Sequence, residues 1–355
     1  MNRWILVILA LALIGTLLAL TTRRKSQSTS LDFAYRSFST PDGQSLVSEG
    51  RLRLFREWCR THNKTYGTFE LAYRFFIWND NYQFVQDVNS QNLSYRLEVN
   101  KFAALTSEEF SALYLGLNWS PDASKAVGLI FLKETGLPDS IDWREKGAVT
   151  EIKNQGECGS CYSFSTVASL EGASFLKSGK LVNFSEQQIV DCSFVHGNKG
   201  CVGGLITYAL AYARDYGVEL AHDYPYKAVD GPCKYNANKV VFHNYDYRNV
   251  PRNNPNQLKA AVAMQPVSVG IQGNEDAFRF YKSGILSSGC GNRWINHAVV
   301  IVGYATSSDQ KDYWIVKNSW GTSWGMEGYI FIERGVQNSG AGLCGINSEA
   351  SHPIN

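Results

Sequence analysis

Three residues far apart in the sequence have the types needed to activate a thiol. Cys161 stands in the run NQGECGSCYSFS (residues 154–165), where a glycine-rich stretch leads into an amphipathic segment. His297 and Asn318 follow 136 and 157 residues further along the chain. A thiol needs a base to become a nucleophilic thiolate near neutral pH, and the base needs a partner that orients its ring. Only a folded cleft could bring these three residues together.

The local motifs around these residues are long and specific. His297 lies in Asn296-His297-Ala298, and Asn318 opens the run KNSWGTSWG (residues 317–325). A C-G-[SA]-C-[WY] signature with a distant His and Asn is typical of the papain and cathepsin proteases. From about Arg51 to its C-terminus the chain resembles a papain-like cysteine protease, with Tyr162 where Trp is more usual. The resemblance implies a Cys-His-Asn endopeptidase that forms an acyl-enzyme.

The same resemblance assigns supporting roles near the nucleophile. Gln155 would donate its side-chain N–H to the oxyanion, and Trp320 would shield the His297–Asn318 contact from water. Taken singly, Cys161 could be a buried structural thiol, His297 a core histidine and Gln155 a surface glutamine. Trp320 and Trp324 could be ordinary core aromatics, and for Trp324 we favour that interpretation. The two long motifs favour catalysis for the others.

Length, composition and charge limit the classes of protein to which the chain can belong. The chain has 355 residues, 44% hydrophobic and 13% aromatic residues, and a net charge of +2. These values indicate a globular chain long enough for two or more domains, and they do not favour nucleic acid as a partner. The sequence calls for no metal and no cofactor.

The N-terminus carries an apolar run, residues 4–20, after a short segment with Arg3. Residues 1–25 therefore predict a signal peptide or a signal anchor, and we favour the signal peptide. The basic residues 23–25 by themselves favour keeping the segment that follows them in the cytoplasm, whereas the cysteine pattern argues for export. We expect the secretory pathway, ending in a lysosome or vacuole or outside the cell, with membrane association only if the segment is retained.

Eight cysteines are present, seven of them beyond residue 136. One nucleophile and three pairs account for these seven, and the family resemblance selects Cys158–Cys201, Cys192–Cys233 and Cys290–Cys344. Disulfides imply an oxidising compartment, and losing one typically costs ~2–5 kcal/mol. The alternative is a zinc site that combines Cys158 and Cys161 with Cys192 and Cys201.

Residues 51–116 form a helical, mixed-charge segment after a polar stretch, residues 26–50. Spacings of three and four place one set of residues on a single helix stripe, which can be a buried face and can also resemble the ERFNIN motif of an inhibitory prosegment: Glu70, Arg74, Trp78, Asn81, Val85 and Asn89. Ala104, in Asn100-x-Phe102-x-Ala104, replaces an Asp that is usual in such prosegments and is linked to acid release. Residues 117–136 predict a linker with the processing region, followed by a peptidase domain at 137–355.

Within residues 137–355 a helix-rich half precedes a β-rich half. Helices are expected over 161–177 and 185–191, and strands over 267–271, 298–304, 313–317 and 329–333. The pattern fits the α+β papain-like fold, with a helical L domain, a β-barrel-like R domain and the cleft between them.

The resemblance also implies how a peptide would bind. Gly203 and Gly204 would let an extended substrate approach the main chain, and Asn296 would offer its carbonyl near the bond being cut. Apolar residues would line the pocket for the second residue before the cut: Leu205, Ile206, Gly270, Ile295 and Ala298.

Glu349 is expected at the floor of this pocket. A carboxylate there would pair with arginine while the apolar walls still accept Phe or Leu, so we expect acceptance of Arg to fall as acid neutralises Glu349. In the alternative interpretation Glu349 points into solvent and decides nothing.

Other partners follow from the resemblance: protein and peptide substrates, the prosegment as an intramolecular inhibitor, and inhibitors of the cystatin type. N-glycosylation acceptors occur at Asn63, Asn92, Asn118 and Asn183. Two rival functions remain, an inactive homologue that serves as a binding protein and a Cys-His acyl transferase with an acceptor other than water.

Overall fold

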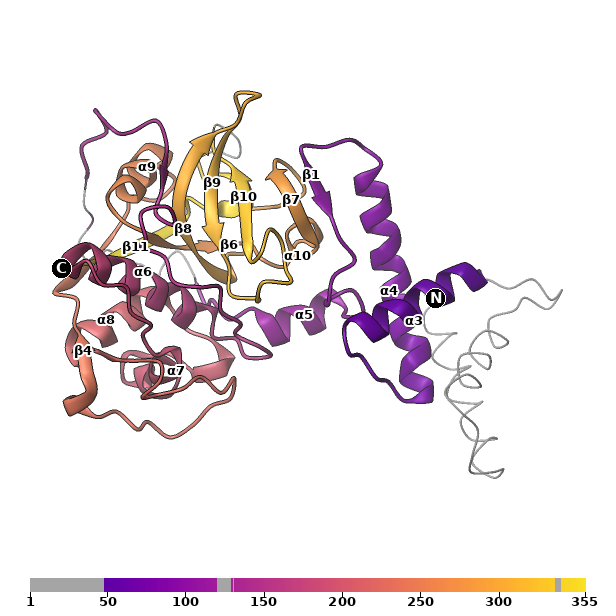
Figure 1. Cartoon of the computed structure of the whole chain (residues 1–355), viewed down its shortest axis with the longest axis horizontal. Coiled ribbons are helices and arrows are strands. Elements are labelled where there is room, and N and C mark those ends of the chain that lie inside the picture. The colour runs from indigo at the N-terminus through magenta and orange to yellow at the C-terminus, as the bar shows by residue number, and fades with distance from the viewer. Residues whose placement is uncertain (1–47, 120–128, 130, 336–339) are drawn as a thin grey trace. The chain divides into compact units, whose positions relative to one another are not determined.

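The computed structural model describes residues 48–119, 129, 131–335 and 340–355 (Figure 1). The chain divides into two compact units, Met1–Asn79 and Asp80–Asn355, and each is considered separately. Within the described residues, every helix is too short or too polar to cross a bilayer. The apolar run at 4–20 and the polar stretch 26–47 lie outside the described residues.

The first unit has an aromatic core built by two helices. Helix α3 (Glu49–Thr61) begins where the side chain of Ser48 accepts a hydrogen bond from the Arg51 N–H. It buries Phe55, whose ring packs edge-on at 5.4 Å against Phe75 from the first part of α4 (Thr68–Asn89). The aromatic content of this segment therefore serves packing.

The stripe expected from the sequence lies on α4. Trp78 and Val85 are buried, whereas Glu70 at the start of the helix is exposed and pairs with Arg74 at 3.4 Å. Asn89, at the end of α4, bonds both main-chain groups of Leu97 at 2.9 Å. The polar members of the stripe thus bind main-chain groups or form an ion pair, and the apolar members pack in the interior.

The rest of residues 51–116 folds within the second unit. Strand β1 (Tyr95–Leu97) pairs with β7 (Tyr281–Leu286), and helix α5 (Ser107–Tyr114) starts with a reciprocal cap between Thr106 and Glu109. The sequence predicted a helical segment and missed β1, because three residues carry too short an alternation to be read as a strand.

The helical lobe holds a continuous apolar core. Its helices are α6 (Cys161–Ser178), α7 (Glu186–Cys192) and α8 (Ile206–Tyr216), with 3₁₀ turns at Ser193–His196 and Gly200–Val202 and a small sheet of β3 (Val218–Glu219) and β4 (Val240–Phe242). The predicted helices at 161–177 and 185–191 correspond to α6 and α7. Buried residues of α6 and α8 share one cluster with Leu117 and Ile295.

The β lobe is a sheet in the order β1-β7-β10-β9-β8-β6-β11-β5, with β2 paired to β8. Its remaining strands are β2 (Ile141–Asp142), β5 (Asp246–Asn249), β6 (Val267–Ile271), β8 (His297–Thr306), β9 (Asp312–Lys317), β10 (Tyr329–Glu333) and β11 (Glu349–Ile354). Helices α9 (Pro255–Met264) and α10 (Asp276–Arg279) and a 3₁₀ turn at Leu343–Gly345 complete it, whereas the 3₁₀ turn at Ala237–Lys239 leads into β4 of the helical lobe.

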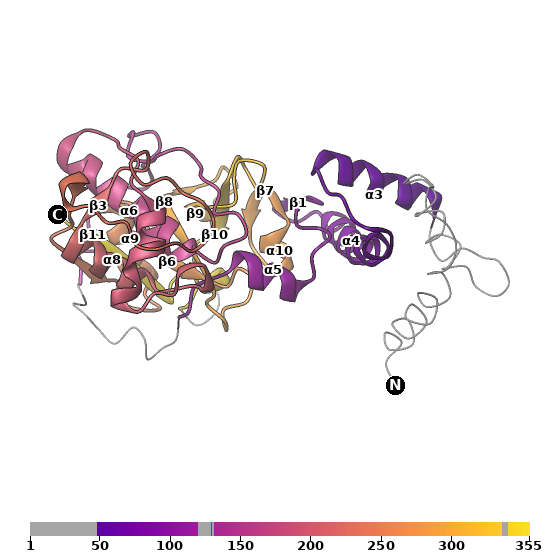
Figure 2. The same cartoon turned by 90° about the horizontal axis from the view of Figure 1, so that it is seen from below.

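The two lobes meet along α6 and β8, which lie side by side in Figures 1 and 2. The Ser165 hydroxyl of α6 donates to the carbonyl of Val299 at 2.7 Å, and the Ser268 hydroxyl of β6 donates to the carbonyl of Ser165 at 2.8 Å. The expected α+β fold of two lobes is confirmed. It brings the first residue of α6, Cys161, to the same boundary as the first residue of β8, His297.

Three disulfides are present, and they join the pairs that the family resemblance selected: Cys158–Cys201, Cys192–Cys233 and Cys290–Cys344. The zinc interpretation is wrong, because Cys158, Cys192 and Cys201 are consumed in these bonds. Nor do the described residues contain a cluster of side chains suited to a metal ion.

Candidate active site

Cys161 begins α6, where the N–H groups of the first turn point toward its thiol and favour a negative charge. In this structure, however, the side chain is fully buried. Burial raises the pKa of the thiol to about 11, and hydrogen bonds from the backbone at Ala298 and Gly116 oppose that rise only in part. The thiol is therefore protonated at neutral pH while Gly116 covers it.

His297 has one ring nitrogen engaged. Its Nε2 lies 2.9 Å from Oδ1 of Asn318, and its ring stacks on Trp320 with centroids 4.6 Å apart. Within the described residues, Nδ1 has no hydrogen-bond partner. Burial lowers the pKa of His297 to about 4, against the opposing effect of the Asn318 hydrogen bond. The imidazole is therefore neutral and oriented.

Asn318 and Trp320 are placed by the turn that follows β9. Asn318 Oδ1 also accepts the Ser319 N–H at 2.8 Å, which fixes the carboxamide. Trp320 is fully buried between two aromatic rings. Its ring centroid lies 5.1 Å from that of Trp324 and 5.5 Å from that of Phe278. Phe278 also lies edge-on to His297 at 6.1 Å, so aromatic rings exclude water from the His297–Asn318 contact.

Gln155 is buried, so the surface-glutamine interpretation is wrong. Its Oε1 accepts the Ser319 hydroxyl at 2.7 Å, and its Nε2 donates to the carbonyls of Cys158, at 2.8 Å, and Tyr114, at 3.0 Å. The carboxamide is thus held with its N–H group toward the prosegment, at the place where Tyr114 ends α5.

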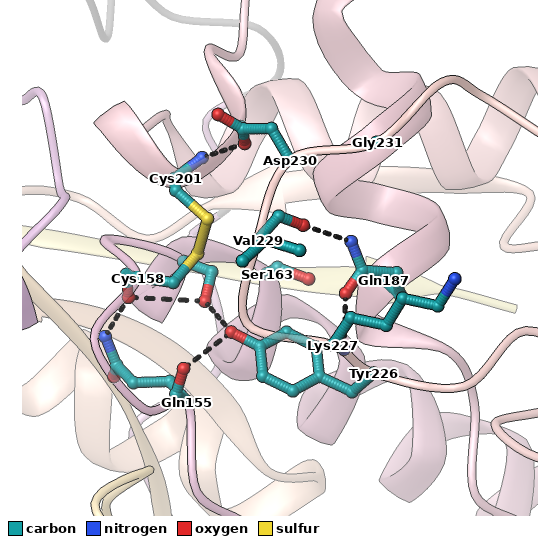
Figure 3. The surroundings of a disulfide bond; sticks show 12 residues. Gln155, Cys158, Ser163, Gln187, Cys201, Tyr226, Lys227, Val229, Asp230 and Gly231 are labelled. Atoms are coloured by element: carbon teal, nitrogen blue, oxygen red, sulfur yellow. Dashed lines mark hydrogen bonds between the residues drawn. A yellow bond between two sulfur atoms is a disulfide. The ribbon is translucent and has the colours of Figure 1, made fainter.

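Tyr226 supports this loop from the helical lobe. Figure 3 shows its hydroxyl between two groups near the Cys158–Cys201 disulfide: it donates to the carbonyl of Gln155 and contacts the Ser160 hydroxyl, each at 2.7 Å. Sequence reasoning missed both Tyr226 and Ser319. Ser319 could have been found, because it stands inside the Asn318–Trp320 motif, but Tyr226 carries no local signal.

Residues 116–118 run across this site as an extended chain. Gly204 donates to the carbonyl of Gly116 at 2.8 Å and accepts from Asn118 at 3.0 Å, while Leu117 donates to the carbonyl of Asn296 at 3.1 Å. Leu117 and Gly204 form a parallel bridge. Gly204 and Asn296, expected to bind main chain, bind it here, and Leu117 and Asn118, assigned to the linker, are the residues bound.

Glycine is required where the Gly203–Gly204 loop meets the bound segment. A Cβ on Gly203, whose φ is +124°, would lie 2.4 Å from the carbonyl oxygen of Gly116. A Cβ on Gly204 would lie 2.3 Å from Oδ1 of Asn198, which accepts the Leu205 N–H at 2.8 Å. Side chains at either position would push the bound chain or its support away.

Leu117 packs against residues that the sequence predicted to line the apolar pocket. A Cβ on Gly270 would lie 2.6 Å from Ile295, 2.8 Å from Leu117 and 3.0 Å from Oε2 of Glu349, so these three side chains converge there. Gly270 pairs with Ala298 across β6 and β8. Of the other expected wall residues, Ile206 belongs to the same buried cluster as Leu117, and Leu205 immediately precedes α8.

Glu349 is buried, with 4% of its surface exposed, so the interpretation in which it points into solvent is wrong. Its Oε2 has no hydrogen-bond partner within the described residues. Burial raises the pKa of this carboxyl to about 8, and the positive charge of Arg252 opposes that rise. With Leu117 in the pocket, Glu349 is mostly protonated at neutral pH.

The comparisons with known proteins agree with this geometry. Residues 137–354 match the papain family cysteine protease model, and residues 55–110 match the cathepsin propeptide inhibitor domain. The chain therefore belongs to the papain family and is a cysteine protease with an inhibitory propeptide.

Relatives and solved structures share this two-part organisation. The chain is 39% identical to vignain of Ricinus communis over 364 residues, covering 100% of this chain and 95% of vignain. It is 39% identical to procathepsin L of Mus musculus over 311 residues, covering 84% and 91%. A recombinant stem bromelain precursor superposes with a TM-score of 0.79 at 38% identity, covering 86% and 99%.

Proposed function

We propose that this protein is a cysteine endopeptidase in which Cys161, His297 and Asn318 act together. The observation that carries the proposal is the 2.9 Å contact between His297 Nε2 and Asn318, beside a thiol at the N-terminus of α6. Asn318 orients the ring, so that Nδ1 is the nitrogen that takes the proton of the Cys161 thiol. The resulting thiolate and imidazolium stabilise each other.

Catalysis proceeds in two displacements. The Cys161 thiolate adds to the peptide carbonyl, and the oxyanion accepts hydrogen bonds from Gln155 Nε2 and the backbone N–H of Cys161. The C–N bond breaks as His297 gives its proton to the leaving amine, which leaves a thioester. Water then adds to the thioester carbonyl with His297 as base, and the thiolate leaves as the carboxylic acid forms.

The prosegment blocks these groups in the precursor. The carbonyl of Tyr114 occupies Gln155 Nε2, the backbone of Gly116 covers Cys161, and Leu117 fills the pocket. Its removal readmits water, so the desolvation that raises the Cys161 pKa and lowers the His297 pKa is relieved. The precursor is thus an inactive zymogen, and the processed chain forms the ion pair.

For specificity, we propose that the Leu117 pocket takes Phe or Leu as the second residue before the cut. An arginine there would bring a positive charge to Glu349, favour its ionised form and form a charge-assisted pair. Acceptance of arginine then falls as acid protonates Glu349, whereas acceptance of Phe or Leu does not depend on that charge.

The test uses processed enzyme and small peptide substrates. An epoxide or vinyl-sulfone probe is expected to label Cys161 stoichiometrically, and Cys161→Ala is expected to abolish both labelling and hydrolysis. Selective loss of kcat/KM for Arg-Arg over Phe-Arg substrates in Glu349→Ala supports the pocket assignment, and equal loss for both contradicts it. No labelling would favour a binding protein, and transfer of the acyl group to an acceptor other than water would favour a transferase.

Several further assignments belong to this proposal. We place the protein in the secretory pathway, in a lysosome or vacuole or outside the cell, with processing between residues 117 and 136 and a mature chain that starts near Leu137. Inhibitors of the cystatin type would compete for the same cleft. Among the glycan acceptors, Asn183 donates its side-chain N–H to Glu151 at 3.1 Å, and a glycan on this nitrogen would compete with that contact.

A further inference from the structure

Arg279, at the end of α10, is a buried cation to which the proposed catalysis gives no role. Its side chain is 1% exposed. Nη2 donates to Oδ1 of Asn81 at 3.1 Å and Nη1 to the carbonyl of Leu105 at 3.3 Å, both from the prosegment. Nε has no hydrogen-bond partner among the described residues.

Only one acidic side chain from the protease region pairs with this guanidinium in the described structure. Asp276 lies 2.8 Å from Nη2, three residues earlier on the same helix, and is 34% exposed. The contact lacks hydrogen-bond geometry, since Oδ1 of Asp276 remains without a hydrogen-bond partner. The flat guanidinium face packs on Phe280, 4.3 Å from the ring centroid. Asp276 therefore balances part of the charge but leaves the N–H donors to other groups.

The path of the prosegment shows on which side of Cys161 the Arg279 side chain lies. Phe110 packs against Trp320 at 5.3 Å and against the Arg279 guanidinium at 5.4 Å. From there the chain passes Gln155 at Tyr114, Cys161 at Gly116 and the Glu349 pocket at Leu117. Arg279 and the pocket thus lie in opposite directions from Cys161 along this path.

We infer that Arg279 forms a carboxylate-binding subsite on the leaving-group side of the cleft, which the prosegment covers until it is removed. The inference rests on the proposed function, which gives the Leu117 pocket to the acyl side of the substrate. Once Asn81, Leu105 and Phe110 leave, the guanidinium keeps Asp276 and Phe280 and presents free donors. A planar guanidinium binds a carboxylate through two parallel hydrogen bonds.

The carboxylate could come from an Asp or Glu side chain after the cut, or from the C-terminus of a short substrate. Amidated peptides distinguish the two sources. We would compare peptides with Leu as the second residue before the cut and Glu or Gln at the first, second or third residue after it. A second pair would carry Gln throughout and end in either a free acid or an amide.

At one of these positions the processed wild-type enzyme is expected to prefer Glu over Gln by about tenfold in kcat/KM, the gain typical of a charge-assisted hydrogen bond. The preference should fall to about onefold in Arg279→Gln and shrink as salt is added. Asp276→Asn should enlarge it, because a competing carboxylate is removed. Arg334→Gln, which removes an arginine paired to Asp312 at 3.0 Å elsewhere in the β lobe, is the matched control.

A preference only for the free acid would assign the subsite to chain ends. Equal rates for Glu and Gln in wild type, for both carboxylate sources, would overturn the inference while leaving the protease assignment intact. A Glu preference that survives in Arg279→Gln would do the same. Failure of the wild-type enzyme to cut any of the peptides would overturn the proposed function and this inference with it. Should Arg279→Gln not fold, the wild-type ratio, its salt dependence and Asp276→Asn still decide.

Discussion

Glu349 and Arg279 are opposite charges that the precursor buries in two different ways. Glu349 faces Leu117 with one oxygen lacking a hydrogen-bond partner among the described residues, and its pKa is raised to about 8. Arg279 keeps two hydrogen bonds to prosegment groups and an ion pair to Asp276. The carboxyl has few partners, whereas the guanidinium has several.

Chemistry explains this difference. A buried carboxyl can take up a proton and lose its charge, so it tolerates an apolar neighbour such as Leu117. A guanidinium cannot be deprotonated in a protein, so it must be supplied with acceptors. The prosegment therefore brings a plain aliphatic side chain to one side of Cys161 and a carbonyl and a carboxamide to the other.

The largest expected effect lies between the two sites, at Cys161. With its pKa near 11 in the precursor, only a trace of the thiol is ionised at pH 7. Processing should raise its alkylation rate by about 10³-fold, because thiolate is the reactive form. Iodoacetamide labelling followed by peptide mass spectrometry measures this rate. Cys59, whose pKa is also raised to about 11 by burial, is an internal reference in the precursor. Equal rates for Cys161 before and after processing would contradict the burial argument.

The next largest effect is on the stability of the precursor and comes from the apolar contact of Leu117. Leu117→Ala should destabilise the precursor by about 3 kcal/mol, since a buried leucine is replaced by a cavity beside Gly270 and Ile295. Chemical unfolding of the precursor in a Cys161→Ala background, which prevents self-cleavage, measures the loss. Leu176→Ala, at a leucine of α6 that is 44% exposed, is the control and should change little. Equal losses of stability in the two variants would show that the contacts of Leu117 do not stabilise the precursor more than those of an exposed leucine.

Removing the positive charge of Arg279 should lower the stability of the precursor by less. Arg279→Gln in the same background should lower the precursor's free energy of unfolding by about 2 kcal/mol, because Leu105 and Asn81 lose charge-assisted donors. Acid processing of the otherwise wild-type precursor should also be faster. Arg334→Gln is the control in the unfolding experiment. An unchanged stability would mean that water replaces the guanidinium without cost.

The last expected effect depends on pH and vanishes in acid. Because the folded pKa of Glu349 is raised to about 8, the folded precursor binds more protons than the unfolded chain between about pH 4.5 and 8. Its contribution to stability is therefore fully present in acid and is lost as pH rises toward 8. Glu349→Gln should raise Tm by at least about 3 °C at pH 8 and leave it unchanged near pH 4. The exposed Glu145→Gln is the control, and equal shifts at both pH values would refute the assignment.

Much of the site could be predicted because its residues stand in contiguous motifs. Cys161, His297 and Asn318 each begin or follow a regular element whose local sequence is distinctive, and the family resemblance extended this to Gln155 and Gly204. The disulfide pairs also came from the resemblance, since spacing alone leaves them open.

What the sequence could not predict depends on contacts between distant segments. Strand β1 exists through its pairing with β7, as at Tyr95 and Gly284. Arg279 looks like a surface residue in its own helix, and the groups of Leu105 and Asn81 that accept its hydrogen bonds come from distant parts of the sequence. Leu117 belongs to a stretch read as a linker, and its role appears only when Gly204 and Gly270 are placed around it.

The bridge between Leu117 and Gly204 has a consequence for maturation. The segment that rests on the nucleophile is Gly116, about twenty residues before the expected new N-terminus near Leu137. A molecule cannot present the later segment to its own Cys161 while the earlier one still occupies Gly204. Processing should accordingly begin slowly and accelerate as the first freed molecules cut their neighbours, with a lag that shortens as the precursor is concentrated.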